Sequence, residues 1–312
     1  MAHDHDVATV PGVLKLRKRL DLEVYPQRLR SRRVWVVKDP ITLRFFQFRE
    51  EEFAILCGLD GRTSLKQIKE RFEQRFAPRR INISRLHTFI AGLHRKGLVI
   101  AETQGQGDPL FSRHQQQRRH EWIAAVANPL AIRFQGIDPT RLLHWLYPKT
   151  KWLFSPVSFL CCVVLAVFAI GIMVGNFAEF RDRLPDLNTF LSPRNLVLMA
   201  IAMAGTKLIH EFGHALTCRH FGGDCHEMGI MLLVFTPCLY CNVTDAWKFN
   251  DRWKRVAIDA AGIVVEILLA SICVLLWWFS QPGLFNTICL NVVVVCSVGT
   301  LLLNGNPLLR YD

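Results

Sequence analysis

A short motif near the middle of the chain combines side chains that bind metal ions with one that can transfer a proton. It reads His210-Glu211-Phe212-Gly213-His214. On a helix, residues four positions apart share one face, so both imidazoles can reach a single zinc ion. Glu211 can then take a proton from a water molecule at that ion. The motif predicts one catalytic Zn²⁺ per chain, and the alternative is a pair of interior, hydrogen-bonded histidines.

A catalytic zinc ion usually has three protein ligands and leaves its fourth position to water. Asp312 is the candidate third ligand, because it follows a long hydrophobic stretch and carries a carboxylate. Lys207 and Glu266 also lie in hydrophobic surroundings. Charged groups in membrane helices are costly and often functional, so we expect Glu266 to face a water-filled cavity or to pair with Lys207.

The composition indicates a membrane protein with a basic, water-facing N-terminal part. Hydrophobic residues make up 51% of the 312 residues, and the formal net charge is +12. The charge is uneven, since residues 1–151 have a net charge of +13 and residues 152–312 have −1. This pattern excludes a disordered protein and a single soluble domain. Several of the ten cysteines lie in apolar runs, which favours a reducing compartment over a disulfide framework.

Four hydrophobic segments are expected to cross the membrane. Residues 152–178 contain 27 residues without a formal charge, which is enough for one helical span. A second span begins at Asn195 and carries the histidine motif near its far end. The third and fourth are placed at 256–280 and 284–303, because a Gln-Pro-Gly turn interrupts a 43-residue uncharged stretch. Residues 228–244 are too short and too broken for a span, so they are interpreted as a re-entrant or interfacial hairpin.

Basic residues near the span ends predict the orientation. Eight lie in the flanks that are cytoplasmic if the N-terminus is inside, against three in the opposite loops. This favours a multi-pass protein with a cytoplasmic N-terminus. In that topology the span with His210 and His214 and the span before Asp312 both end at the same leaflet, which supports a shared metal site.

The N-terminal half predicts a small α+β domain. Residues 33–37 and 41–46 are β-rich runs separated by a turn, and helices are expected over 50–57 and on either side of residue 80. Ser64 and Gln67 form a capping box, and Gly97 ends the last helix before a final strand. The order β-β-α-α-α-β over about 34–102 indicates a winged-helix domain.

This domain resembles the PqqD-like family of peptide chaperones. The resemblance rests on the Asp39-Pro40 turn, on Glu52-x-x-Ile55-Leu56-x-x-Leu59-Asp60-Gly61 and on Lys96-Gly97-Leu98. It implies that a leader peptide adds as a strand to the exposed edge of the hairpin. Two alternatives remain: a basic face near lipid headgroups, and DNA binding through arginines such as Arg75 and Arg85. The lipid-facing surface and peptide binding are favoured over DNA binding, so no nucleic-acid partner is expected.

Residues 195–312 resemble the site-2 protease family of intramembrane zinc metalloproteases. The resemblance rests on His210-Glu211-x-x-His214, on the hairpin and on Asn304-x-x-Pro307-x-x-x-x-Asp312. It implies that His210, His214 and Asp312 hold zinc and that Glu211 is the base. In the family a glycine usually follows the aspartate, whereas this sequence stops there, so we expect a chain truncated at its C-terminus.

The resemblance also implies hydrolysis of a peptide bond in an extended substrate, because a helix hides its amide groups. A substrate strand is expected to pair with the first strand of the hairpin, which comprises Met228, Gly229, Ile230, Met231, Leu232 and Leu233. Cys238 and Cys241, with Cys225 and His226 upstream, make a second metal site conceivable. Ordinary buried thiols explain the same pattern.

The predicted fold is mainly α, with a polytopic helical membrane domain of about four spans plus a re-entrant hairpin, and an N-terminal α+β winged-helix domain. The expected parts are a tail (1–32), a PqqD-like domain (33–102), a linker with an interfacial amphipathic segment (103–151) and a membrane-embedded zinc peptidase domain (152–312). The predicted function is a zinc metalloendopeptidase of the bacterial inner membrane that cleaves peptide or membrane-protein substrates in the lipid bilayer. The alternative is a non-catalytic component of peptide maturation or export that binds leader peptides.

Overall fold

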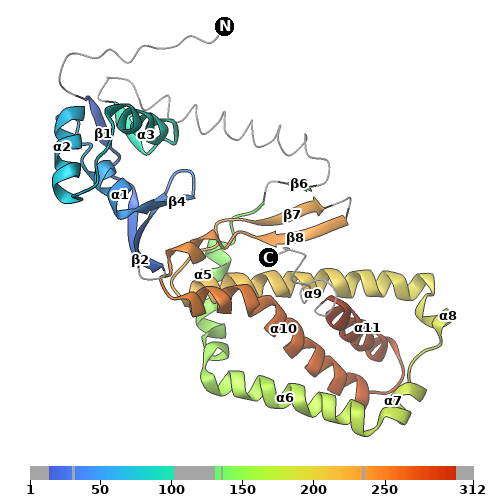
Figure 1. Cartoon of the computed structure of the whole chain (residues 1–312). Coiled ribbons are helices and arrows are strands. Elements are labelled where there is room, and N and C mark those ends of the chain that lie inside the picture. The colour runs from blue at the N-terminus through green and yellow to red at the C-terminus, as the bar shows by residue number, and fades with distance from the viewer. Residues whose placement is uncertain (1–13, 30–31, 102–130, 135, 234–235, 300–312) are drawn as a thin grey trace. The chain divides into compact units, whose positions relative to one another are not determined.

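The computed structural model describes residues 14–29, 32–101, 131–134, 136–233 and 236–299. The chain forms two compact units, residues 1–127 and 128–312, and each is described by itself. Most residues of the described part are helical (Figure 1). Residues 304–312, with the Asn-Pro-Asp motif, lie outside it.

The first unit contains two small antiparallel sheets. In the larger one β3 is central, and in the smaller one the first and last strands of the unit pair. The strands are β1 (Leu16–Lys18), β2 (Glu23–Leu29), β3 (Arg32–Asp39), β4 (Arg44–Arg49) and β5 (Val99–Ala101). The expected hairpin is β3–β4, with Val37 opposite Phe46. The structure differs from the expectation in that β1 and β2 lie where a tail was predicted. Pro26 and the charged residues of β2 argue against a strand when the sequence is read alone. The segment is a strand because it pairs with β3.

Three helices cover the strands of the first unit. They are α1 (Glu50–Cys57), α2 (Leu65–Arg75) and α3 (Ile83–Arg95). The predicted capping box is confirmed, since Ser64 Oγ accepts from Gln67 N at 3.3 Å and Gln67 Oε1 accepts from Ser64 N at 3.0 Å. Gly97 follows α3 with a φ of +74°, a conformation that glycine adopts without strain. Leucine side chains from the helices and from the segment before β5 are fully buried between these elements: Leu56, Leu86 and Leu98.

The second unit is a helical bundle with a three-stranded sheet at one end. Its helices are α5 (Thr140–Thr150), η1 (Lys151–Phe154), α6 (Pro156–Gly175), α7 (Phe177–Asp182), α8 (Leu187–Phe190), α9 (Pro193–His220), η2 (Thr244–Lys248), α10 (Arg252–Phe279) and α11 (Leu284–Val298). Its strands are β6 (Ala131–Arg133), β7 (Met228–Leu233) and β8 (Thr236–Cys241).

Three of these helices, α6, α9 and α10, are long and apolar enough to cross a membrane. The fourth expected span is described only in part, as α11, because residues 300–303 lie outside the description. Local sequence explains where the long helices begin. Ser155 and Ser192 each cap the helix that starts with the following proline, and Asp251 Oδ1 accepts from Trp253 N at 2.9 Å at the start of α10.

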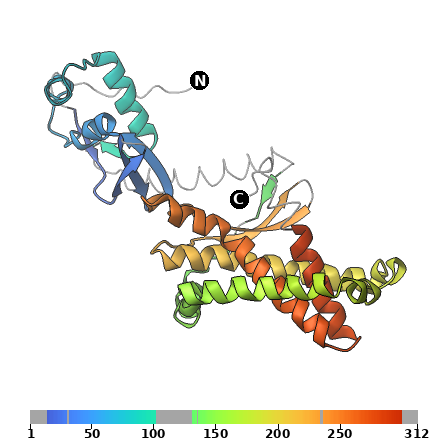
Figure 2. The ribbon, with the colours of Figure 1, turned by 60° about the horizontal axis from the view of Figure 1, so that its bottom comes forward.

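α10 lies beside α9, α11 and α6 in both views (Figures 1 and 2). Between α11 and α9, Asn291 Nδ2 donates to Asn195 Oδ1 at 2.8 Å, and both side chains are buried. Amide pairs of this kind hold helices together where no water is present. α6 exposes most of its apolar side chains, as a helix that faces lipid does.

The sheet has the order β6-β7-β8, and all of its pairings are antiparallel. The hairpin β7–β8 occupies the place predicted for it. β6 was not predicted, because three residues beside a turn carry no periodic pattern. It adds to the outer edge of β7, and the pairing continues through Phe134 N, which donates to Ile230 O at 3.0 Å, and Ile137 N, which donates to Met228 O at 2.7 Å.

Candidate metal centre

α9 brings the two histidines of the motif together in its buried part. His210 Nε2 and His214 Nε2 lie 3.1 Å apart, and both residues are almost completely buried. The spacing of four residues puts them one turn apart on the face that packs against α10. The ring atoms that meet are therefore the two nitrogens that a metal would bind.

The other ring nitrogen of each histidine lies against an oxygen atom. His214 Nδ1 is 2.7 Å from the carbonyl oxygen of Ile258, on α10. His210 Nδ1 is 2.9 Å from Glu266 Oε1, although the two atoms are not aligned as in a good hydrogen bond. Such partners place the proton on Nδ1 and leave the lone pair on Nε2, as in many metal sites.

This arrangement fits a metal ion. If both rings carry their proton on Nδ1, two Nε2 lone pairs face each other, and a metal ion bound between them removes the repulsion. A tetrahedral zinc ion about 2.0–2.1 Å from each nitrogen holds its ligand nitrogens roughly 3.3 Å apart. The observed 3.1 Å is close to that separation. His210 and His214 therefore suit two of the ligand positions of zinc.

Two glycines allow the helices to come this close, and the sequence analysis did not identify either as part of the site. A Cβ atom on Gly262 would lie 2.3 Å from His210 Nε2 and 2.5 Å from His214 Nε2. A Cβ atom on Gly213, inside the motif, would lie 2.9 Å from a methyl carbon of Val265. The only sequence signal is the small-residue run Ala260-Ala261-Gly262 in an apolar helix, which is typical of close helix packing.

Glu211 lies on the side of α9 that is next to β8. Burial raises the pKa of the Cys238 thiol, and the Glu211 carboxylate adds to this rise. The pKa of Cys241 is also raised, mainly by its hydrogen bond with Cys225 and by burial, with a contribution from Glu211. The carboxylate thus acts on both thiols of β8, and Glu211 directly follows His210 in the chain.

In the described ranges of the chain, no third His, Cys, Asp or Glu joins the two histidines in a metal-binding group. Asp312, the expected third ligand, lies outside those ranges. Lys207 Nζ lies 2.7 Å from Glu266 Oε1, which is one of the two arrangements that the sequence suggested for Glu266. Glu266 itself is 1% exposed. It contacts His210 at Nδ1 and so lies behind the ring, away from the position of a metal.

The hairpin edge that was expected to bind substrate is occupied by the chain itself. β7, residues Met228–Leu233, pairs with β8 on one side and with β6 on the other. This differs from the expectation of a free edge on the first strand. The segment that binds there lies almost one hundred residues earlier in the sequence, so no local pattern could indicate it.

The outer strands of the described sheet are β6 and β8, and β8 is the free edge of the hairpin. Asn242 N donates to Glu227 O at 2.8 Å, so the pair next to the hairpin base is hydrogen-bonded. Hydrogen-bonded and non-hydrogen-bonded pairs alternate along an antiparallel ladder. Leu239 is opposite Ile230, three pairs along from Asn242, and so belongs to a non-hydrogen-bonded pair. Its N–H and C=O therefore point away from β7. β8 is also the strand nearer α9 (Figure 1). A partner strand on this edge would run close to Glu211.

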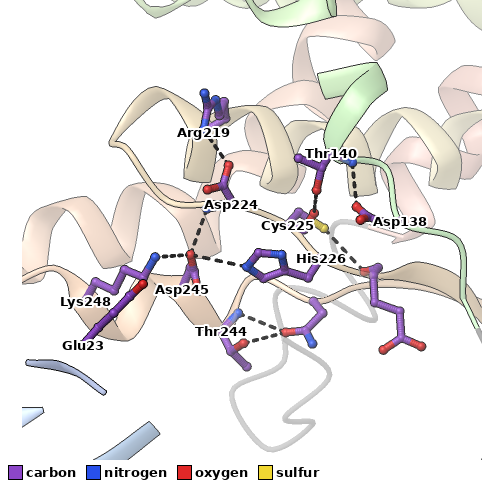
Figure 3. Close-up of polar contacts among 12 residues, drawn as sticks. Glu23, Asp138, Thr140, Arg219, Asp224, Cys225, His226, Thr244, Asp245 and Lys248 are labelled. Atoms are coloured by element: carbon purple, nitrogen blue, oxygen red, sulfur yellow. Dashed lines mark hydrogen bonds and ion pairs between the residues drawn. The ribbon is translucent and has the colours of Figure 1, made fainter. Parts of the chain in front are cut away.

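A network of charged groups joins the end of α9 to the hairpin (Figure 3). Asp245 is 1% exposed and its Oδ2 accepts from Asp224 N at 3.1 Å and from Lys248 Nζ at 2.5 Å. Arg219, in the last turn of α9, donates to Asp224 at 2.5 Å. Thr140, at the start of α5, donates to the carbonyl oxygen of Cys225 at 3.2 Å. These contacts fix the loop between α9 and β7, and so the position of the hairpin relative to Glu211.

The cysteines near the hairpin form a thiol pair. Cys225 Sγ and Cys241 Sγ lie 3.2 Å apart at the base of the hairpin, and their hydrogen bond lowers the pKa of Cys225. Within the described residues, neither these thiols nor His226 belong to a group of three metal-binding side chains. The second metal site considered from the sequence thus has no support there.

A protein-family model matches part of the chain. Residues 198–304 match the model of peptidase family M50. The matched segment contains the histidine motif, the hairpin and Glu266. No curated protein and no solved structure matches the chain.

Proposed function

We propose, on the premise of the match to peptidase family M50, that the chain is a membrane-embedded zinc metalloendopeptidase of the site-2 protease kind. The match and the three apolar helices together support a membrane protease. The finer proposal concerns the metal, the residues and the substrate. The observation that carries it is the pair of Nε2 atoms 3.1 Å apart, each on a ring whose Nδ1 lies against an oxygen atom.

His210 and His214 would hold the zinc ion, with Asp312 as the proposed third ligand. When bound, zinc supplies Lewis-acid polarisation of the scissile carbonyl and of the attacking water. Glu211 takes a proton from that water and gives it to the leaving amine. The buried position of the histidines on α9 excludes bulk water, which strengthens each of these electrostatic interactions.

We propose that the substrate is a peptide or a membrane-protein segment in extended form, and that it pairs with the free edge of β8. Leu239 offers one N–H and one C=O in the direction away from β7. A strand bound by these groups has its backbone exposed to Glu211, whereas a helix would hide it. β6 covers the opposite edge of the hairpin, so β8 is the edge of the hairpin that remains open to a substrate in the described sheet.

We further propose that residues 33–102 form a cytoplasmic PqqD-like domain that recognises a leader peptide, in a protein of the bacterial inner membrane with its N-terminus inside. The support is the order of strands and helices over this segment and the basic flanks of the spans. β4 is an edge strand of its sheet and contains no proline, so its backbone can pair with a peptide.

The test of the catalytic proposal compares the native chain with Glu211→Gln in detergent micelles, with fluorescein-labelled casein as an unfolded probe. We expect about one zinc per chain in both proteins by elemental analysis, and cleavage only by the native chain. His210→Ala should lose both zinc and cleavage. Glu70→Gln serves as the matched control, because Glu70 is an exposed helix residue of the first unit, and it should behave as the native chain.

Two outcomes would contradict the proposal. A purified native chain without zinc, and unable to take it up, would mean that the two histidines do not form a zinc site. A chain that holds zinc but leaves a range of extended peptides and membrane segments intact would favour the non-catalytic, peptide-binding alternative. For the third ligand, Asp312→Asn should lower the zinc content, and an unchanged zinc affinity would exclude Asp312 as a ligand.

A further inference from the structure

Glu266 and Lys207 form a partly buried ion pair behind one of the two histidines. Glu266 Oε1 lies 2.7 Å from Lys207 Nζ and 2.9 Å from His210 Nδ1. Glu266 is 1% exposed, and the Lys207 side chain is 27% exposed. The same carboxylate oxygen thus contacts an ammonium group from α9 and the imidazole one turn further along that helix.

Three helices enclose this contact. Glu266 projects from the middle of α10, and Lys207 and His210 project from α9. Gly299, at the end of α11, lies over the pair, since a Cβ atom there would be 3.5 Å from Lys207 Nζ and 3.7 Å from Glu266 Oε2. On its other side the His210 ring touches Gly262, where a Cβ atom would be 2.3 Å from Nε2. The ring is therefore confined between the backbone of α10 and the Glu266 carboxylate.

A carboxylate in this position is costly unless it performs a function. Removing a charged group from water carries a large desolvation penalty in proteins, and a single ion pair often does no more than offset this penalty. A hydrophobic residue of the same size would pack between three apolar helices without that cost. A hydrophobic residue could provide neither the ion pair with Lys207 nor the contact with His210 Nδ1, and only the second contact reaches the histidine pair.

We propose that Glu266, oriented by Lys207, is a positioning residue that fixes the His210 ring with its Nε2 lone pair directed at the zinc ion. This inference rests on the proposed zinc peptidase function and assigns a role to two residues outside the reacting groups. The Ile258 carbonyl oxygen orients the His214 ring in the same way, since it lies 2.7 Å from His214 Nδ1. One ligand is thus oriented by a backbone group that no substitution can remove, and the other by a side chain.

This asymmetry predicts a partial effect. Loss of the Glu266 carboxylate leaves both histidines present and His214 still oriented, so the zinc affinity should fall without being abolished. Removal of a residue that orients a metal ligand typically lowers metal affinity roughly 10- to 100-fold. Because Glu266 does not touch the scissile bond, cleavage at saturating zinc should stay close to that of the native chain.

The experiment measures zinc affinity of the full chain in detergent, stripped of metal with a chelator and titrated against a chromophoric competitor. Glu266→Gln should bind zinc roughly 10- to 100-fold more weakly than the native chain, and Glu266→Asp should recover part of the loss. The visible absorption spectrum of Co²⁺ in the site should also change in Glu266→Gln, because it reports the geometry of the ligands. Ser271→Ala is the matched control: Ser271 is a buried polar residue of α10 that donates to Ile267 O, and its loss should change neither readout.

The thermal unfolding of the metal-free proteins separates positioning from a purely structural role. If Glu266→Gln unfolds earlier but binds zinc with native affinity and the native Co²⁺ spectrum, the inference is wrong. If the unpaired Lys207 prevents Glu266→Gln from folding, the neutral double variant Lys207→Gln/Glu266→Gln should fold and show the same weaker binding, and native affinity in this variant would equally overturn the inference. Failure of the native chain to bind zinc would instead remove the proposed function itself.

Discussion

Gly262 of α10 lies in direct contact with the His210 ring of α9, so close that a Cβ atom would be 2.3 Å from Nε2. The backbone of one helix thus forms a wall of the candidate metal centre. It also brings the Ile258 carbonyl, one turn earlier, to His214 Nδ1 at 2.7 Å.

Gly262→Ala is therefore expected to disrupt zinc binding. The methyl group must displace both rings, which costs about 1–3 kcal/mol as overpacking and misplaces the ligand nitrogens. We expect a loss of zinc affinity of at least about tenfold, measured by competition with a chelator. Gly205→Ala on α9 is the control, because a Cβ atom at Gly205 meets nothing within 4 Å, and it should bind zinc normally. Native affinity in Gly262→Ala would show that the two rings do not need this contact.

Leu239→Pro tests the substrate edge of β8. The substitution removes an N–H that points away from β7, and proline is tolerated on an edge where it breaks no ladder bond. We expect casein cleavage to fall about fivefold while the zinc content is unchanged, because the loss of one backbone hydrogen bond to the substrate removes about 1 kcal/mol of binding. Leu239→Ala keeps the N–H and should cleave nearly as the native chain does. Equal activity of the two variants would place the substrate elsewhere.

Gly136→Ala tests the attachment of β6 to the hairpin. A Cβ atom on Gly136 would lie 2.5 Å from Met228 O, so the segment after β6 must move away from β7. Overpacking of about 1–3 kcal/mol corresponds to roughly 5- to 150-fold faster hydrogen exchange at Phe134 N and Ile137 N, which donate across this contact. Gly171→Ala, where a Cβ atom meets nothing within 4 Å, should leave both amides protected. Unchanged hydrogen exchange in Gly136→Ala would mean that the backbone near Gly136 accommodates the methyl group without loosening the attachment of β6.

Asp60 predicts an acid-sensitive contribution to the stability of the first unit. Hydrogen bonds from Arg62 N, Thr63 Oγ1 and Thr63 N lower the pKa of this carboxyl from 3.8 to about 2. A folded-state pKa below the unfolded value stabilises the fold above pH 3.8, and this stabilisation disappears as the pH falls through about 2.

The comparison is between native residues 1–127 and Asp60→Ala, unfolded with urea between pH 2 and pH 6. Asp60→Ala should be less stable at pH 6, and the difference should shrink as the pH falls below 4. Glu70→Gln, which removes an exposed carboxylate of α2, should follow the native curve. A difference that is constant over the whole range would assign the effect to the neutral hydrogen bonds of the turn rather than to the charge.

Much of the molecule could be predicted from its sequence, because the relevant interactions are local. The four-residue spacing of His210 and His214, the capping box of Ser64 and Gln67 and the Ser-Pro starts of α6 and α9 all act within one or two turns of helix. Long runs without charged residues predict the apolar helices, because hydrophobicity is also a property of the local sequence. Four spans were expected, and the described residues contain three helices of sufficient length.

The features that could not be predicted join residues that are distant in the sequence. β6 covers an edge of β7, Ile258 offers only a backbone carbonyl, and Gly262 acts through the absence of a side chain. None of these leaves a periodic or compositional pattern, since a carbonyl group is the same in every residue. The sequence alone therefore determined which residues could bind a metal and move a proton. Helix packing determined which atoms contact the histidines, and the pairing of β6 with β7 determined which edge of the hairpin is free.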